Sequence, residues 1–174
     1  MNFCPRCGHP LKDAFKYGKT RRVCDACGFV HFRDPKVAAV VFVAEGNRVL
    51  MVQRAFNPQK GKWALPAGYI DYGEDPREAG IREVQEETGL EVVIRRVIDV
   101  LGPDPSGENP ASIVILFEGE RIGGVLAAAD DAKRAEFFSP DEIPLDEIAF
   151  ESTRQLIKAW VESQNGSERF ASQP

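Results

Sequence analysis

The chain has 174 residues, 43% of them hydrophobic, and a formal net charge of −5. This length supports one sizeable hydrophobic core with a small module beside it, and it excludes two large domains. No apolar run approaches the ~18 residues of a transmembrane helix, and the N-terminus, MNFCPRCGHP, lacks the basic start and hydrophobic stretch of a signal peptide. The sequence therefore predicts a soluble cytoplasmic protein without a membrane partner.

All four cysteines lie near the N-terminus, in two Cys-x-x-Cys-Gly motifs at residues 4–8 and 24–28. Two such pairs at this spacing suit a tetrahedral Zn²⁺ site, and four thiolates would leave no open position, so the metal would be structural. Two disulfides are the alternative, which a cytoplasmic location disfavours. We predict a zinc ribbon over residues 1–34 with the ligands Cys4, Cys7, Cys24 and Cys27.

The N-terminal segment also differs in charge from the rest of the chain. Residues 1–36 hold eight lysines or arginines against three acidic residues, a formal +5, which leaves −10 for the remainder. Such a basic module could contact a nucleotide phosphate through Lys19, Arg21 and Arg22, although a solvated face is the commoner outcome. The acidic sequence pI of about 5.2 argues against nucleic acid as a partner.

After a boundary at Asp34-Pro35, the hydrophobic pattern predicts several strands and a C-terminal helix. A hairpin is predicted with strands at 37–43 and 48–54. Further strands are predicted at 64–67, 92–100, 112–120 and 135–138. Residues 150–161 carry the apolar face of a helix. Loops at 56–62 and 102–110 are long enough to shape a site, and the polar tail 164–174 is expected to be flexible.

Residues 68–90, GYIDYGEDPREAGIREVQEETGL, predict a helix that Asp75 caps, that begins at Pro76 and that stops at Gly89. Three glutamates fall on this helix at positions i, i+3 and i+4, so their carboxylates share one face. They would repel one another without a cation, and oxygen ligands of this kind favour Mg²⁺ or Mn²⁺. The predicted metal ligands are Glu83, Glu86 and Glu87.

The same segment resembles the complete Nudix box, in the order Gly68, five residues, Glu74, seven residues, Arg82-Glu83-Val84, one residue, Glu86-Glu87, one residue, Gly89-Leu90. A solvated acidic helix would not explain the glycines and Glu74 in register with the acidic cluster. The likeness covers roughly residues 37–162. It implies an α/β/α sandwich with a mixed sheet over residues 35–163, and a hydrolase of pyrophosphate bonds.

The resemblance also implies roles for individual residues. The backbone carbonyl of Gly68 would join the three glutamates as a ligand of the catalytic metal, while Glu74 would brace the loop before the helix and Arg82 would orient the carboxylates. A divalent ion would screen the phosphate oxygens and lower the pKa of a bound water. Glu136, just before an aromatic pair, resembles the position of a further ligand or base; a surface strand residue is the equal alternative.

Three residues are candidates for substrate contact. Trp63 and Tyr69 could stack on a nucleobase or flavin ring, with the core as the alternative place for Trp63. Arg54, at the end of a predicted strand, could meet a terminal phosphate, although strand ends are commonly solvated.

Two Nudix groups carry a similar four-cysteine ribbon. The NADH pyrophosphatase group shows a Ser-Gln-Pro-Trp-type motif, and residues 92–114 contain no Gln-Pro-Trp. The plant-type FAD and ADP-ribose pyrophosphatases are similar in ribbon size and in the runs WALPAGYIDYGED and DEIPLDEIAFES. The resemblance therefore favours hydrolysis of FAD or ADP-ribose to two monophosphates, with a homodimer as a possible assembly. NADH or NAD hydrolysis, and a non-catalytic module that senses nucleotides or binds nucleic acid, remain alternatives.

Overall fold

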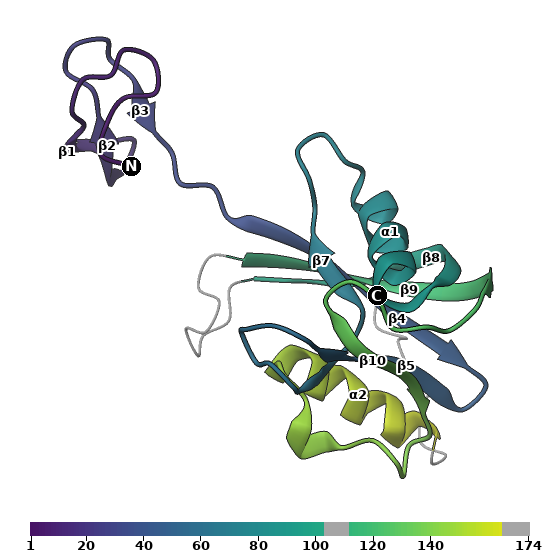
Figure 1. The fold of residues 1–174 in the computed structure, drawn as a ribbon. Coiled ribbons are helices and arrows are strands. Elements are labelled where there is room, and N and C mark those ends of the chain that lie inside the picture. Colours follow the sequence, from purple (N-terminus) through teal and green to yellow (C-terminus); the bar gives the residue numbers. More distant parts are fainter. Residues whose placement is uncertain (103–111, 165–174) are drawn as a thin grey trace. The chain divides into compact units, whose positions relative to one another are not determined.

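The computed structural model describes residues 1–102 and 112–164, so the predicted loop beyond Gly102 and the predicted tail beyond Gln164 lie outside the described residues. The chain divides into two compact units, Met1–Pro35 and Lys36–Pro174 (Figure 1). No helix in the described part has the length and apolar character needed to cross a membrane.

The small unit is an antiparallel sheet of β1 (Lys12–Lys16), β2 (Lys19–Val23) and β3 (Val30–His31) in that order. Its core is small and consists of Cys4, Leu11 and Cys24, with Phe29 packed against them. A core of this size is too small to stabilise a fold by itself. Small modules of this kind usually need a bound metal or disulfides to fold.

The described part of the large unit contains the strands β4 (Lys36–Glu45), β5 (Arg48–Arg54), β6 (Trp63–Ala64), β7 (Ala67–Tyr69), β8 (Leu90–Leu101), β9 (Ser112–Gly124) and β10 (Ala132–Phe138). The main sheet has the order β10-β5-β4-β9-β8, with β6 beside β5 and β7 beside β4. The β4–β9 pair is parallel and the other neighbours are antiparallel. The sheet is therefore mixed, as expected.

Most of the predicted strands are confirmed, each within a strand of equal or greater length. The single strand predicted at 64–67 is wrong, because Ala64 ends β6 and Ala67 begins β7, and the two strands pair with different neighbours. Pro66 lies between them and has no N–H to donate to a ladder. Its carbonyl instead accepts a hydrogen bond from the backbone N–H of Val41 at 3.0 Å.

Two helices cover the two faces of the sheet, α1 (Pro76–Thr88) on one and α2 (Glu151–Gln164) on the other (Figure 1). Alternation along β4 supplies both cores, because successive side chains of a strand point to opposite faces. Val41 and Val43 pack with the α1 core, whereas Phe42 packs with the α2 core. The predicted α/β/α sandwich is confirmed.

The ends of α1 follow the sequence signals. The side chain of Asp75 accepts a hydrogen bond from the backbone N–H of Arg77 at 2.7 Å, and Pro76 occupies the first turn. Gly89 ends the helix with φ 68°, and its N–H donates to the carbonyl of Gln85. A Cβ at this position would lie 2.6 Å from the carbonyl oxygen of Val125, so both backbone shape and space require glycine.

The C-terminal helix is confirmed as α2, which begins one residue later than predicted and continues to Gln164. Ile157 and Trp160 are its buried anchors. The indole of Trp160 meets the ring of Phe42 edge-on, with 5.9 Å between the ring centroids. This helix thereby closes the face of the sheet opposite α1.

Candidate active site

Two glutamates of α1, Glu83 and Glu87, lie against the backbone of β7. Gly68 pairs with Ala39 of β4, and a Cβ added to Gly68 would lie 2.0 Å from the carboxyl carbon of Glu83. A side chain at this position would displace the Glu83 carboxylate. The close approach of helix and strand brings the Glu83 carboxylate to the backbone of Gly68.

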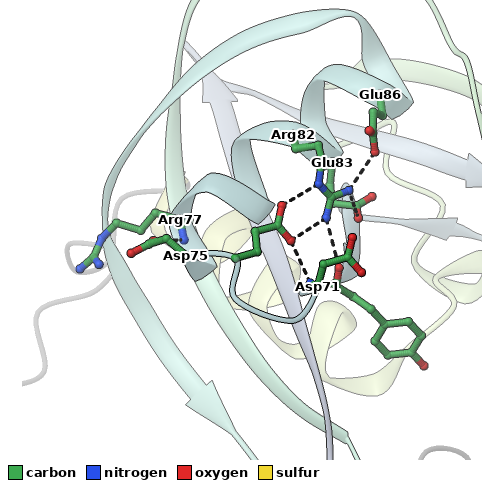
Figure 2. Close-up of polar contacts among 8 residues, drawn as sticks. Asp71, Asp75, Arg77, Arg82, Glu83 and Glu86 are labelled. Carbon is green, nitrogen blue, oxygen red and sulfur yellow. Dashed lines mark hydrogen bonds and ion pairs between the residues drawn. The ribbon is translucent and has the colours of Figure 1, made fainter.

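Arg82 connects the loop before α1 to the acidic face of the helix. Its guanidinium donates to both carboxylate oxygens of Glu74, at 2.7 and 3.0 Å. The Nη1 group donates to Glu83 at 2.7 Å and to Glu86 at 2.9 Å. Figure 2 shows Arg82 between Glu83 and Glu86. One cation thus holds three carboxylates in fixed positions.

Glu74 in turn closes the loop. Its carboxylate accepts from the backbone N–H of Asp71 at 2.9 Å, in addition to the two bonds from Arg82. These bonds favour the charged form, and the Arg82 guanidinium in particular lowers the pKa of Glu74 to about 2. Glu74 is therefore ionised at neutral pH and braces the turn that leads into the helix.

Glu87 is the most deeply buried of the box glutamates, with 3% of its surface exposed. It accepts a hydrogen bond from the backbone N–H of Ala67 at 3.0 Å. Burial raises its pKa to about 9, and the neighbouring Asp131 carboxyl adds to the rise. Burial also raises the pKa of Glu83, against the opposing effect of Arg82. Carboxyls in such a position need a compensating positive charge to ionise at neutral pH.

Asp131 belongs to this cluster although the sequence analysis did not select it. It lies just before β10, where its backbone carbonyl accepts from the N–H of Ala55 at 2.8 Å. Its Oδ1 atom is buried and has no hydrogen-bond partner among the described residues. A buried carboxylate oxygen without a donor is the expected place for a cation. The sequence signal was the acidic pair Asp130-Asp131 before a strand, which by itself does not indicate proximity to α1.

These observations test whether a metal fits. The donor atoms are carboxylate oxygens, two of the carboxyls are pushed toward the neutral form by burial, and one oxygen lacks a partner. A hard divalent cation would satisfy all three conditions. The site therefore fits such an ion, with Glu83, Glu87 and Asp131 on the buried side and Glu86 on the exposed side.

A cavity of about 790 Å³ adjoins the acidic cluster. One end is lined by acidic groups, including Glu83, Glu86 and Asp131. Apolar residues also line the cavity, namely Ala38, Val40, Leu65, Leu101, Val114 and Phe150, together with the polar Arg54, Asn57, Glu151, Ser152, Thr153 and Gln155. A ligand that fills this space would place a charged centre at the α1 end and a flat or apolar group along the wall.

The small unit forms a second candidate metal site. Four sulfur atoms, those of Cys4, Cys7, Cys24 and Cys27, lie within 4.8 Å of one another and form no disulfide. Two of the separations are 3.5 Å, close to the edge of a tetrahedron whose corners lie ~2.3 Å from a central zinc. In each pair the glycine after the second cysteine donates back to the first cysteine at 2.9 Å, with φ 73°. The donor set fits a closed tetrahedral metal.

Comparison with known proteins assigns both units. Residues 33–160 match the family model of the NUDIX domain, and residues 2–33 match the Nudix N-terminal model, a zinc ribbon. The chain belongs to the Nudix family. The segment from Gly68 to Leu90, which has the residue pattern of the Nudix box, lies within the matched residues, and members of the family typically use divalent metals.

Three relatives illustrate the likeness. The ADP-ribose pyrophosphatase of Methanocaldococcus jannaschii is 37% identical over 135 residues, 78% of this chain and 78% of that protein. The NAD-capped RNA hydrolase NudC of Stutzerimonas stutzeri is 27% identical over 161 residues. The match covers 91% of this chain but 55% of that protein, so the chain spans about half the length of this relative. A NUDIX hydrolase crystal structure from Nitrosomonas europaea has a TM-score of 0.87 at 28% identity, covering 98% and 97% of the two chains. This chain is a Nudix pyrophosphohydrolase of nucleotide derivatives.

The predicted substrate residues fall in different places. Arg54 and Tyr69 line the cavity beside the Nudix box. Arg54 is held by a hydrogen bond from its Nε to the carbonyl of Pro58 at 2.8 Å, and its guanidinium lies 5.3 Å from the ring centroid of Phe150. Lys36 places its ammonium 4.4 Å from the ring centroid of Tyr69. Both residues therefore lie beside the acidic cluster, and their contact with a substrate stays a prediction.

Trp63 does not line the cavity. Its indole is 4% exposed and packs edge-on against Phe138, with 4.7 Å between the ring centroids. The backbone carbonyl of Trp63 accepts from the N–H of Ala149, which ties β6 to the segment before α2. This position is the core alternative that the sequence left open for Trp63.

Glu136 also lies apart from the Nudix box. Its carboxylate accepts from Nε of Arg134 at 2.8 Å and does not line the cavity. Successive side chains of β10 point to opposite faces of the sheet. Phe137 packs with the α1 core and Phe138 with the α2 core, and Glu136, two residues before Phe138, lies on the same face as Phe138. Glu136 therefore points away from the face that carries α1, as in the surface-strand alternative.

Proposed function

We propose that this Nudix hydrolase cleaves the pyrophosphate of a nucleoside diphosphate derivative of the ADP-ribose or FAD type and releases two monophosphates. The observation that carries the proposal is the composition of the cavity beside the Nudix box. Among its described lining residues, Arg54 and Arg82 are the only cations, and Arg82 already binds three carboxylates. A single pyrophosphate with a ring at one end suits this wall better than a triphosphate chain, whose extra charge would need more cations.

The proposed catalytic metal is Mg²⁺ or Mn²⁺. The ligands would be Glu83, Glu86 and Glu87, with the backbone carbonyl of Gly68. Supporting this choice, Glu83 lies against Gly68, Glu87 accepts from the N–H of Ala67 next to it, and all of these groups offer oxygen donors. When bound, such an ion screens the phosphate oxygens and makes an attacking water more acidic. Arg82 and Glu74 would act as positioning residues that keep the glutamates from separating.

Asp131 is the proposed additional carboxylate in place of Glu136. Its Oδ1 is buried without a hydrogen-bond partner in residues 1–102 and 112–164, and its carboxyl faces Glu87 closely enough to raise the pKa of that residue. A carboxylate here can hold the metal or accept a proton from the attacking water. Arg54, across the cavity, would contact the phosphate that carries the second group of the substrate.

The proposed ion of the small unit is Zn²⁺. Four cysteine thiolates fill a tetrahedral coordination sphere and leave no position for water or substrate. The role of this ion would therefore be structural, and the small core of the unit supports that role.

A second candidate substrate is NADH or NAD. The relative named NAD-capped RNA hydrolase matches 91% of this chain, across both units, although the chain covers only 55% of that protein. The missing Gln-Pro-Trp motif argues against this choice. The ADP-ribose pyrophosphatase relative is more similar, at 37% identity, and supports the first proposal.

A substrate panel with product analysis tests these alternatives. ADP-ribose, FAD, NADH, nucleoside triphosphates and diadenosine polyphosphates would be incubated with Mg²⁺ or Mn²⁺. We expect AMP with ribose 5-phosphate from ADP-ribose, or AMP with FMN from FAD, at the highest kcat/KM. Preferred cleavage of triphosphates would overturn the proposed substrate class, and turnover of none would favour a sensing module without catalysis.

A further inference from the structure

The zinc-ribbon unit has positive charge that its own acidic groups do not neutralise. Residues 1–35 contain seven lysines and arginines and three aspartates. Lys12 pairs with Asp25 at 2.9 Å, and Arg22 pairs with Asp13 at 3.4 Å. The cations without an ion-pair partner among the described residues are Arg6, Lys16, Lys19, Arg21 and Arg33.

Exposed aromatic rings accompany these cations. Tyr17 is 74% exposed and Phe32 is 48% exposed, and their rings are stacked with centroids 5.9 Å apart and an interplanar angle of 23°. The guanidinium of Arg21 lies 4.5 Å from the centroid of Phe32. The core of the unit contains neither ring, so packing does not explain them. The rings of Tyr17 and Phe32 and the guanidinium of Arg21 thus lie together at the surface.

Strand pairing gathers the charge around the rings. Arg21 and Lys19 lie two residues apart on β2, and Lys19 is directly opposite Lys16 on β1, so the three side chains share one face of the sheet. Nε of Arg21 donates to the backbone carbonyl of Lys16 at 3.2 Å, which restrains the guanidinium. We call the surface formed by Lys16, Tyr17, Lys19, Arg21 and Phe32 the hairpin face.

Tyr17 occupies an uncommon backbone position. It begins the turn between β1 and β2 with φ 51°, a conformation that bulky side chains rarely adopt. Glycine or asparagine would adopt it at lower cost, as is usual in two-residue hairpin turns. The turn therefore carries an aromatic ring where local backbone preference alone would not select one.

We propose that the hairpin face binds single-stranded nucleic acid. Unpaired bases would stack on the rings of Tyr17 and Phe32, while Lys16, Lys19 and Arg21 contact phosphates. A duplex hides the faces of its bases, and an acidic protein surface offers no flat groups to match the stacked rings. Whole-chain acidity does not oppose this, because the negative charge resides outside residues 1–35. The inference is independent of the substrate proposed for the Nudix box.

Fluorescence anisotropy on the full, zinc-loaded chain tests the proposal. The probes are fluorescein-labelled oligouridylate RNA and oligothymidylate DNA of about 12 nucleotides, with a duplex of equal length as a third arm. Between about 50 and about 200 mM NaCl, three phosphate contacts should weaken single-strand binding by about 20-fold. We expect the duplex to bind more weakly than either single strand, and the RNA and DNA arms show which sugar is preferred.

Variants separate stacking from charge. Phe32→Leu and Tyr17→Leu keep an apolar side chain but remove the plane, and each should weaken single-strand binding roughly tenfold without changing the salt dependence. Arg21→Gln should also reduce the salt dependence. Phe3→Leu is the matched control, because Phe3 is an exposed ring of the same unit without a stacking partner among the described residues. This variant should bind single strands with wild-type affinity.

Three results would overturn the proposal. One is the absence of single-strand binding at low salt, which would also be the outcome if the hairpin face were covered by another part of the chain or by a second copy. The second is wild-type affinity of both leucine variants, which would reduce the interaction to non-specific charge. The third is equal or tighter binding of the duplex. Hydrolysis by the Nudix domain in the Phe32→Leu variant should equal that of the wild type in every case.

Discussion

Arg82 and Glu74 are joined by two parallel hydrogen bonds, Nε to Oε1 at 2.7 Å and Nη2 to Oε2 at 3.0 Å. The pair spans the turn that connects β7 to α1, so it links the loop of the Nudix box to its helix. Bidentate pairs of this kind restrict geometry as well as contribute energy. The positions of Glu83 and Glu86, which bind the same guanidinium, depend on this link.

Replacing Glu74 should therefore cost stability in a pH-dependent way. Arg82 lowers the pKa of Glu74 from 4.5 to about 2, so the stabilisation is fully present above pH 4.5 and is lost as the pH falls toward 2. We expect Glu74→Gln to unfold at lower urea concentration than the wild type at pH 7, with the difference shrinking below about pH 4.5. Urea titrations across this range measure it. Glu78→Gln, at an exposed position of the same helix, is the control for the loss of one surface charge.

Removing a box glutamate should abolish metal-dependent turnover while the fold remains. For Glu87→Gln we expect a loss of at least about a hundredfold in kcat, since one ligand and one charge disappear together. Mn²⁺ should raise the melting temperature of the wild type but not of the variant, because only a bound ion stabilises the native state. Wild-type hydrolysis by Glu87→Gln would show that the assigned site is wrong.

Gly68→Ala tests the close approach of β7 and α1. The added Cβ would lie 2.0 Å from the carboxyl carbon of Glu83 and must displace that carboxylate. We expect Mn²⁺ affinity to fall by roughly 10- to 100-fold, as is typical when a ligand loses its positioning contacts. Isothermal titration measures the affinity. Gly102→Ala is the matched control, because a Cβ there meets no described residue within 4 Å. Equal losses in both variants would contradict the steric explanation.

Asp131 and Glu136 can be compared directly as the additional carboxylate. Asp131→Asn should lower kcat by about 10²- to 10⁴-fold, because its carboxylate faces Glu87 in the buried cluster. Glu136→Gln should stay close to the wild type, since its carboxylate pairs with Arg134 and does not line the cavity. Steady-state rates with the preferred substrate decide between them, and the reverse order of effects would restore Glu136 as the candidate.

Cys24→Ser should release the ion from the small unit. The sulfur of Cys24 is fully buried in the core of the ribbon, so loss of the metal and loosening of the fold should occur together. Native mass spectrometry should find one Zn²⁺ per wild-type chain and none in the variant. His31→Ala serves as the control, because His31 is absent from the sulfur cluster. A wild-type chain with four free thiols and no zinc would refute the assignment.

Local sequence signals were sufficient for the elements that depend on neighbouring residues. Asp75, Pro76 and Gly89 predicted both ends of α1, because helix caps are satisfied by side chains and backbone within a few positions. The spacing of the glutamates and of the cysteine pairs was equally local. The hydrophobic pattern predicted most strands, and the error at 64–67 came from Pro66, which interrupts a run that looks continuous by hydropathy.

Tertiary structure alone decided which side chains meet across the fold. Trp63 enters the core because β6 packs between Phe138 and the segment before α2. The register of β10 on β5 turns Glu136 toward the α2 face, whereas Asp131, in the turn before β10, reaches the α1 cluster. Likewise, only the pairing of β1 with β2 gathers separate cations and rings into one face. These contacts join residues distant in sequence, so their geometry depends on strand register and on bulges, which composition and periodicity do not determine.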